Sequence, residues 1–345
     1  MSVRLASTVL LVRDRESSGG VEVFMERRHI ESDFVGGAYV FPGGSVDPED
    51  RIPEGLCRGL DDREASARLG IDHGGLAFWV AAIRECFEEA GVLLAYAPGG
   101  ELLDFADPAT EDRFRDLRND LNARTIGLIE LAEREGLELA TDRMHYWGHW
   151  ITPEGQPRRY DTRFFIAQAP ENQTAAHDDW ELVHSAWVTP AEAIERAVRR
   201  EWMIIFPTLV NLERLGELGR AEDALTWAAS APELPAMVPR VLGDRIVLPG
   251  DEGYETAQRD TSRSGPEIWF RQFQRALDKS SASEMSSPPA KPTKSDGERA
   301  LDKSSASEMS SPSAKPTKSD GERALSASSD EPIRTCREQV HGEAD

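Results

Sequence analysis

Apolar runs separated by turn residues mark the strands of the predicted fold. Residues 5–12 (LASTVLLV) and 21–27 (VEVFMER) flank a polar Ser-Ser-Gly-Gly turn, which predicts an N-terminal β-hairpin. Residues 144–151 and 159–167 predict two more strands around a Thr-Pro-Glu-Gly turn, and residues 182–188 predict another. Strands are therefore expected on both sides of a long central segment.

Helical periodicity fills the intervals between these strands. Residues 76–94 repeat apolar positions at helical spacing, and residues 111–135 predict two charged amphipathic helices. A further helix over residues 190–200 begins with Thr-Pro-Ala-Glu, a capping box with proline at the first helical position. Because strands and helices interleave, we expect a mixed sheet with helices on its faces, in the α/β (α+β) class.

Composition changes abruptly near residue 276. Residues 276–299 recur as residues 300–323 with one change, Pro289 in the first copy and Ser313 in the second. Because this Ser-, Pro- and Lys-rich repeat lacks apolar periodicity, it cannot bury enough surface to offset the entropy of ordering its backbone. We expect a folded domain over residues 1–255, a linker over 256–275 and a disordered tail over 276–345. The repeat is explained either by a recent duplication without function or by a tail that docks to a partner.

Charge narrows the classes of partner. The chain has 62 acidic and 40 strongly basic residues, a formal net charge of -22. This excess disfavours nucleic-acid binding, and an anionic substrate would need a divalent cation as intermediary. No signal-peptide or membrane-spanning pattern occurs, and Cys57, Cys86 and Cys336 form no C-x-x-C motif. We therefore expect a cytoplasmic protein with free thiols and no membrane partner.

Three carboxylates share one face of the helix predicted before Gly91. Glu85, Glu88 and Glu89 stand at positions i, i+3 and i+4, where like charges destabilise an isolated helix. A hard cation such as Mg²⁺ offsets this repulsion and keeps positions open for phosphate oxygens. An ordinary solvated acidic face is the alternative for the helix alone.

Residues around this helix make the chain resemble the Nudix hydrolases. The family motif joins an upstream glycine to Arg-Glu-apolar-x-Glu-Glu-x-Gly-apolar, which is similar to Gly44 and residues 84–92 (RECFEEAGV). The resemblance implies a Nudix α/β/α sandwich with a mixed β-sheet, extended here by C-terminal helices, and metal-dependent hydrolysis of a diphosphate. It also implies that Glu85, Glu88, Glu89 and the carbonyl of Gly44 hold Mg²⁺ or Mn²⁺.

The same resemblance implies further catalytic roles. Arg84 would orient Glu85, which could instead act mainly as the base on the attacking water. Glu181, which precedes a late strand, would be a further ligand or base, and Asp178 and Asp179 compete with it for this role.

Phosphate binding needs basic side chains. Arg27, Arg28 and Arg159 are candidates because a planar guanidinium meets phosphate bidentately. Trp147 and Trp150 are expected in the core, with stacking on adenine as the alternative.

An insertion departs from the usual Nudix motif. The early acidic position of the family corresponds to Asp50, but a much longer segment separates it from Arg84 than in the family. Asp47, Glu49 or Asp50 could each support Arg84. We expect the inserted residues 51–75 to lie near the mouth of the site.

The insertion and its flanking motifs are similar to the acyl-coenzyme A diphosphatase branch of the family. Residues 41–47 (FPGGSVD) and 206–209 (FPTL) share this similarity, whereas the upstream coenzyme A signature matches at Gly37 but has Asp33 in place of an arginine. The branch implies cleavage of coenzyme A or acyl-coenzyme A into 3',5'-ADP and (acyl-)4'-phosphopantetheine.

Other functions on the same fold remain alternatives. A Nudix hydrolase could act instead on ADP-ribose, NADH or another nucleoside diphosphate derivative. A non-catalytic ligand-sensing protein is a further alternative, although such a protein has no need for the three motif glutamates. The sequence leaves open whether the chain acts alone or as a homodimer.

Overall fold

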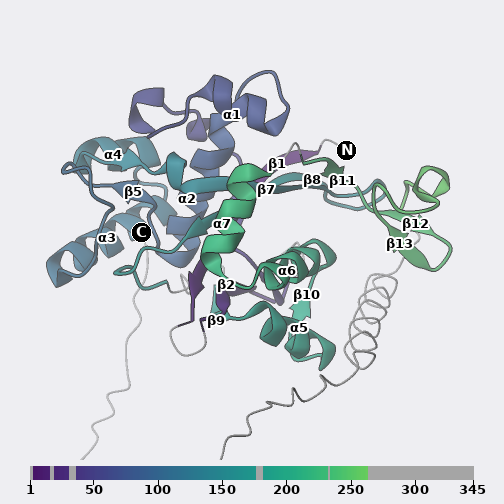
Figure 1. Cartoon of the computed structure of the whole chain (residues 1–345). Helices are drawn as coiled ribbons and strands as arrows, with labels where there is room; N and C mark the ends of the chain where they lie inside the picture. The colour runs from purple at the N-terminus through teal and green to yellow at the C-terminus, as the bar shows by residue number, and fades with distance from the viewer. Residues whose placement is uncertain (1–2, 16–18, 31–35, 176–181, 232–233, 263–345) are drawn as a thin grey trace, which may run out of the picture. The chain divides into compact units, whose positions relative to one another are not determined.

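The computed structural model describes residues 3–15, 19–30, 36–175, 182–231 and 234–262 (Figure 1). In this part of the chain the strands are β1 (Arg4–Asp14), β2 (Val21–Arg28), β3 (Ala38–Val40), β4 (Gly43–Ser45), β5 (Ala95–Tyr96), β6 (Glu138–Leu139), β7 (Met144–Ile151), β8 (Tyr160–Gln168), β9 (Leu182–Val188), β10 (Met203–Ile204), β11 (Ala236–Met237), β12 (Arg240–Leu242) and β13 (Arg245–Val247). The α-helices are α1 (Asp62–Leu69), α2 (Leu76–Ala90), α3 (Pro108–Asn122), α4 (Leu128–Glu135), α5 (Pro190–Val198), α6 (Phe206–Leu218) and α7 (Ala221–Ser230). Short 3₁₀ helices are η1 (Pro48–Asp50), η2 (Glu54–Leu56), η3 (Thr141–Arg143) and η4 (Tyr254–Thr256).

A mixed nine-stranded sheet forms the centre of the fold. Its strand order is β10-β3-β2-β1-β8-β7-β11, with β4 paired to β1 and β9 paired to β2. β1 and β8 run parallel, whereas β1–β2, β2–β3 and β7–β8 are antiparallel. β8 pairs with one edge of β1. The opposite edge of β1 is shared by two strands: residues 6–8 pair with β4, and residues 12–14 pair with β2. β4, which carries Gly43 and Gly44, is thereby fixed against the middle of β1.

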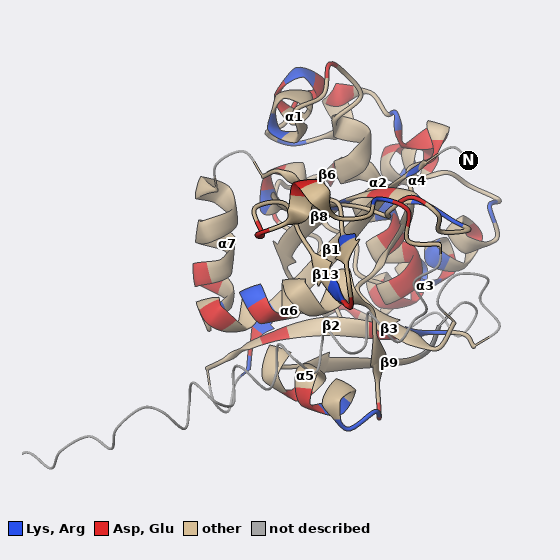
Figure 2. Cartoon of the chain, turned by 90° about the vertical axis from the view of Figure 1, so that its right-hand side faces the viewer, with Lys and Arg blue, Asp and Glu red and all other residues tan. Residues whose placement is uncertain are grey.

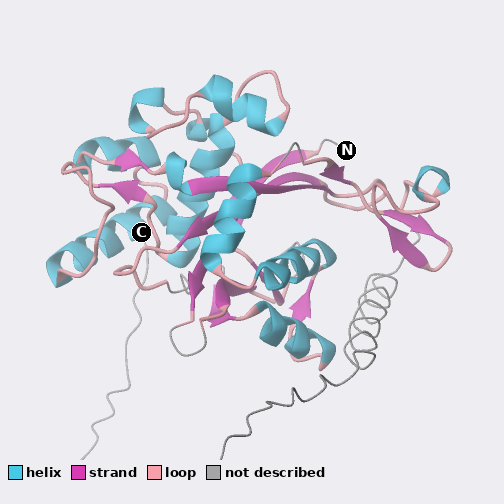
Figure 3. Ribbon diagram, in the orientation of Figure 1, coloured by secondary structure: helices cyan, strands magenta, loops and turns pink. Residues whose placement is uncertain are grey.

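Helices cover both faces of this sheet (Figure 3). On one face α2, α3 and α4 pack with Val9 and Leu11 of β1. On the other face α6 and α7 pack with the alternate residues of β1, and Trp147 and Trp150 of β7 lie in this second core as predicted. Because successive strand residues point to opposite faces, the continuous apolar run of β1 fills both cores.

These elements confirm the predicted fold class and most of the predicted segments. The N-terminal hairpin forms β1 and β2, the later strand pair forms β7 and β8, and residues 111–135 form most of α3 and all of α4. The capping box of α5 is present: the Glu192 N–H donates to Thr189 Oγ1 (3.2 Å) and the Thr189 N–H donates to Glu192 Oε2 (3.0 Å). Apolar periodicity continues over residues 76–94, but α2 ends at Ala90, as expected for a helix before Gly91, because Gly91 adopts a left-handed φ of 71°.

The inserted residues 51–75 do not all border the acidic end of α2, so the expectation about their position is wrong for α1. Asp62 of α1 accepts hydrogen bonds from the Leu76 N–H (3.0 Å) and the Gly74 N–H (2.9 Å). The insertion therefore caps the N-terminal end of α2. At 1.5 Å per residue, that end lies about 18 Å from Glu88 along the helix axis.

Several predictions fall outside the described residues. They concern the repeat-containing tail, most of the linker, Cys336, Asp33, Asp178, Asp179 and Glu181. Within the described residues, Cys57 and Cys86 are buried free thiols. In the same part of the chain, no helix combines the length and the apolar character that a membrane crossing requires.

A buried glutamine fixes the segment that follows α2. Gln173 is 6% exposed and lies beyond the end of β8. Its Oε1 accepts from the Leu93 N–H (2.9 Å), and its Nε2 donates to Leu93 O (3.1 Å) and Leu103 O (2.9 Å). One side chain thus satisfies three buried backbone groups next to the end of the acidic helix.

We expect Gln173→Ala to lower the free energy of unfolding by about 2–4 kcal/mol. Each buried backbone group left unpaired costs about 1–3 kcal/mol, and water can replace part of the lost bonding. Urea unfolding measures the loss. Gln168→Ala, at the exposed end of β8, is the matched control and should change stability by less than about 0.5 kcal/mol. Equal stability of the two variants would contradict the anchoring role of Gln173.

Candidate active site

Long-range contacts hold α2 against the sheet. Ser7 Oγ in β1 donates to Phe78 O (2.8 Å), and Trp79 Nε1 donates to Met144 O (3.1 Å). The Trp79 ring also packs on Phe165, with ring centroids 4.5 Å apart. These contacts fix the helix so that its acidic C-terminal half lies beside β4. Figure 2 shows acidic positions on α2 and on the neighbouring α3.

Arg118 of α3 donates hydrogen bonds to backbone carbonyls at the C-terminal end of α2. Its Nε donates to Glu88 O (3.0 Å) and its Nη2 donates to Glu89 O (2.5 Å). A positive charge at this end also interacts favourably with the helix dipole. A Cβ at Gly91 would lie 2.8 Å from Arg118 Nη1, so glycine suits both the positive φ and the space available.

The glycine pair of β4 brings backbone against two of the glutamates. A Cβ at Gly44 would lie 2.3 Å from Glu85 Oε1, so a glycine permits this approach. The Gly43 N–H donates to Glu89 Oε2 (2.7 Å). Gly44, Glu85 and Glu89 were predicted to share a site, and they lie together although the insertion separates them in sequence.

Arg84 is the centre of a buried ion network. Its Nε and Nη2 donate to the two oxygens of Asp50 (2.8 and 3.0 Å), and its Nη1 donates to Glu85 Oε1 (2.9 Å) and Glu88 Oε2 (2.8 Å). Asp50 is 1% exposed. Asp47 reaches Arg84 Nη2 only at 4.0 Å. Of the acidic residues that the sequence left as alternatives, Asp50 makes the bidentate contact.

A local turn positions Asp50 for this contact. The Asp47 N–H donates to Asp50 Oδ2 (2.7 Å), and η1 turns the chain between these two residues. The remaining insertion then folds away toward the other end of α2 before the chain returns to Arg84. Spacing along the sequence could not reveal this contact, because the insertion separates its two partners.

Burial makes the ionised state of the acidic face costly. Burial raises the pKa of Glu85 to about 7, and the negative charge of Glu88 adds to this rise. The positive charge of Arg84 lowers the same pKa in part. Burial also raises the pKa of Glu88, which Arg84 partly opposes. The pKa of Glu89 is raised well above its usual range by burial and by the charges of Glu26 and Glu85. A bound cation would favour the ionised carboxylates and so oppose these shifts.

Glu26 belongs to this electrostatic cluster and was not among the predicted site residues. It lies on β2, is completely buried, and acts on the pKa values of both Glu89 and Cys86. The sequence contained a signal, because an acidic residue interrupts the apolar strand VEVFME. That signal does not reveal which helix faces the residue.

The donors at this site suit a hard divalent cation. The carboxylates of Glu85 and Glu89 lie against the backbone of β4 at Gly44, and Mg²⁺ prefers such oxygen ligands. In the conformation described, Glu85 and Glu88 accept from Arg84, while Glu89 accepts from Gly43. Among the described residues, no three His, Cys, Asp or Glu side chains converge closely enough to hold an ion. Metal binding would therefore exchange some of these hydrogen bonds for ligand bonds.

The three arginines predicted to bind phosphate are not brought together. Arg28 lies near the acidic face, where its charge opposes the rise in the pKa of Glu89 that burial causes. The Arg28 Nε is buried and donates no hydrogen bond within the described residues. Arg27 lies instead near Tyr39. Burial raises the pKa of Tyr39, and the positive charge of Arg27 partly lowers it. Arg159 lies just before β8, away from both.

Comparison with known proteins agrees with this geometry. The family model described as the NUDT19 Nudix domain matches residues 61–215. The acyl-coenzyme A diphosphatase NUDT19 of Gallus gallus is 29% identical over 279 residues, which cover 68% of this chain and 72% of that protein. Its counterpart in Homo sapiens is 29% identical over 286 residues, with the same two coverages.

A solved structure extends the likeness to the fold. The crystal structure of a NUDIX hydrolase from Alicyclobacillus acidocaldarius is 26% identical, with a TM-score of 0.51, and covers 66% of this chain and 96% of its own. Residues 61–215, which the family model matches, include α2 with its arginine and glutamates. The family model, the curated relatives and this solved structure thus all liken the chain to the Nudix hydrolases, and the relatives liken it to their acyl-coenzyme A diphosphatase branch.

Proposed function

We propose that this chain is a Nudix hydrolase that uses Mg²⁺ or Mn²⁺ to cleave the diphosphate linkage of coenzyme A or acyl-coenzyme A. The products would be 3',5'-ADP and (acyl-)4'-phosphopantetheine. The observation that carries the proposal is the buried acidic end of α2 held against Gly43 and Gly44. Relatives named acyl-coenzyme A diphosphatases support the class of substrate. We propose a cytoplasmic location on the sequence features alone.

Glu85, Glu88, Glu89 and the carbonyl of Gly44 would hold the cation. When bound, the cation would neutralise charge on the diphosphate and make a water more acidic. The electrostatics of the site support this assignment, because buried carboxylates that repel one another are stabilised by a positive ion. The nearby charge of Glu26 adds to this repulsion and so also favours a bound cation.

Arg84 acts as a positioning residue in this proposal. Its bidentate contact with Asp50 fixes the guanidinium plane, so its Nη1 holds Glu85 and Glu88 at defined positions. Glu85 could instead act mainly as the base that accepts a proton from the attacking water, because a carboxylate beside a cation is ionised at neutral pH. Glu181 is the proposed alternative for this base.

Arg28 is the best supported of the proposed phosphate-binding residues. A buried donor without an acceptor costs about 1–3 kcal/mol, and a phosphate oxygen of the substrate would supply that acceptor. Arg28 also lies close enough to Glu89 for their charges to interact. Arg27 and Arg159 remain candidates without comparable support.

ADP-ribose, NADH and other nucleoside diphosphate derivatives are the rival substrates. They share the diphosphate group, so the acidic end of α2 does not distinguish them from coenzyme A. The distinction must come from contacts to the 3'-phosphate and to the pantetheine arm, which these rivals lack.

We expect Glu89→Gln to reduce kcat by more than about a hundred-fold with an unchanged or raised Tm. Loss of a residue that merely supports a metal ligand costs about 10–100-fold, and loss of a ligand should cost more. The neutral amide also relieves repulsion with Glu26 and Glu85. Turnover, Mn²⁺ affinity by electron paramagnetic resonance and Tm are measured together. Glu130→Gln, exposed on α4, is the control. Normal Mn²⁺ affinity and turnover in Glu89→Gln would refute its metal role.

Asp50→Ala should destabilise the protein by about 3–5 kcal/mol, because it leaves Arg84 buried without its bidentate partner. Its kcat should fall by about 10–100-fold, as expected for loss of a group that orients metal ligands. Asp47→Ala is the matched control, since Asp47 is more exposed and 4.0 Å from Arg84; it should cost less than about 1 kcal/mol. Chemical unfolding and steady-state kinetics measure both effects. Equal losses in the two variants would remove the special role of Asp50.

Coenzyme A or an acyl-coenzyme A should have the highest kcat/KM in a panel that includes ADP-ribose, NADH and 3'-dephospho-coenzyme A. The dephospho compound should be about 10–150-fold worse, because one charge-assisted phosphate contact contributes about 1.5–3 kcal/mol. Chromatography with Mg²⁺ or Mn²⁺ identifies the products. If ADP-ribose or NADH is cleaved better than every coenzyme A species, the substrate proposal is wrong and the assignment to the Nudix hydrolases still holds.

A further inference from the structure

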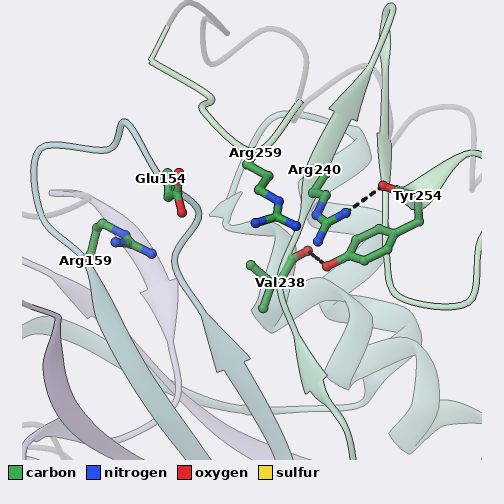
Figure 4. Close-up of a pocket in the computed structure, with 6 residues that line it drawn as sticks. All are labelled: Glu154, Arg159, Val238, Arg240, Tyr254 and Arg259. Carbon is green, nitrogen blue, oxygen red and sulfur yellow. Dashed lines mark hydrogen bonds between the residues drawn. The ribbon is translucent and has the colours of Figure 1, made fainter. Parts of the chain in front are cut away.

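A recess separate from the acidic end of α2 lies between the β7–β8 turn and the C-terminal hairpin of β12 and β13. Its volume is about 180 Å³. Figure 4 shows the residues that line it: Glu154, Arg159, Val238, Arg240, Tyr254 and Arg259. They come from segments that are far apart in the sequence, so the recess exists only in the folded chain.

The lining of this recess is basic although the chain is strongly acidic. Three arginines face one glutamate, a formal charge of +2 in a chain with a net charge of -22. Guanidinium groups that share a small space repel one another, and an anion between them relieves this repulsion. The recess therefore has the charge of an anion site.

The arginines are held in place by groups that leave their charge largely uncompensated. Arg240 lies over the Tyr254 ring, 3.9 Å from its centroid, and its Nη1 donates to Tyr254 O (2.9 Å). Arg159 Nε donates to Thr152 O (3.0 Å), which leaves its Nη groups for other acceptors. Glu255 reaches Arg240 at 3.4 Å, but its side chain is 85% exposed and this ion pair is weak.

Arg259 is an exposed side chain whose guanidinium is accessible to a ligand. Its guanidinium makes no hydrogen bond or ion pair with another described residue, and Figure 4 shows it among the side chains that line the recess, drawn between Glu154 and Arg240. The backbone is tied on both sides of it: the Gln258 N–H donates to Val241 O (2.8 Å), and the Thr261 N–H donates to Glu154 O (2.8 Å). Arg259 is therefore presented by an ordered segment.

We propose that this recess binds a phosphate monoester dianion. Planar guanidinium groups meet phosphate oxygens bidentately, and arginines from separate segments can do so from several sides. Arg159 was predicted from the sequence to bind phosphate, and the structure supplies Arg240 and Arg259 as its neighbours.

The recess is distinct from the site on α2. Gly44 and Tyr160 pair with Ser7 and Arg4 on opposite edges of β1. Strand spacing and rise per residue then separate Gly44 from Tyr160 by about 14 Å. The bound group is either a second phosphate of an extended substrate, which rests on the proposed function, or the phosphate of a separate compound.

Binding is tested on the full chain without added divalent cation, so that the result does not depend on turnover. Titration calorimetry with inorganic phosphate and with 3',5'-ADP, at constant ionic strength, compares the wild type with Arg259→Ala. We expect affinity for both ligands to fall by about ten-fold or more in Arg259→Ala, as for the loss of one charge-assisted contact. Arg245→Ala, on the same hairpin but outside the recess, is the matched control and should retain wild-type affinity.

A second measurement identifies the source of the phosphate. If the 3'-phosphate of coenzyme A occupies the recess, Arg259→Ala should bring kcat/KM for coenzyme A close to that for 3'-dephospho-coenzyme A. If a separate compound occupies it, Arg259→Ala should lose phosphate affinity and keep the wild-type ratio of the two constants. Equal phosphate affinity in wild type and Arg259→Ala, or no measurable binding to either, would overturn the proposal, whatever the outcome of the substrate panel.

Discussion

The buried ion pair between Arg84 and Asp50 is the interaction on which the candidate site depends. Taking two charges out of water costs several kcal/mol per ion, and the pair tolerates this cost only because its geometry is bidentate. The same guanidinium also binds Glu85 and Glu88, so one side chain couples η1 to the acidic face of α2. Because the pair joins the two ends of the insertion, the intervening residues can cap the far end of α2 without displacing the acidic end.

Local patterns predicted much of this structure because they depend on neighbours in the chain. The motif on α2 and the capping box before α5 place their residues within a few positions of one another, where helical spacing alone sets the geometry. Gly91 was recognised as a motif residue, but its left-handed conformation ends the helix before Val92, which periodicity did not show. The mixed sheet followed from the alternation of strand and helix signals.

Long-range relations were the part that the sequence could not supply. Asp50 was one of three alternatives because its partner lies beyond a segment with its own fold. Glu26 was missed because its effect on Glu89 arises only when β2 lies beside α2. Arg27, Arg28 and Arg159 were grouped by chemistry, yet the sheet separates them, and the neighbours of Arg159 come from the end of the described chain.

Under the proposed function, the acidic face would tie stability to ligand content. Glu85 and Glu89 are buried with raised pKa values, so the metal-free fold holds carboxylates that would be more stable in water. A cation that binds the folded chain and not the unfolded one would stabilise the fold by mass action. The apolar contacts of α2, with Trp79 and Phe165 among them, therefore support a helix whose polar end is destabilising without a ligand.

The two edges of β1 differ in the sequence separation of their partners, which has a consequence for the order of folding. β1 pairs in parallel with β8 over most of its length, and these partners are separated by nearly half the chain. Non-local pairings of this kind form slowly, because the intervening chain must be closed into a loop first. β4 is close to β1 in sequence, so Gly43 and Gly44 can pair with β1 before β8 is synthesised, whereas the opposite edge of β1 stays open until β8 arrives. The backbone that meets the glutamates of α2 can therefore be in place early, while the sheet on which α2 packs is completed late.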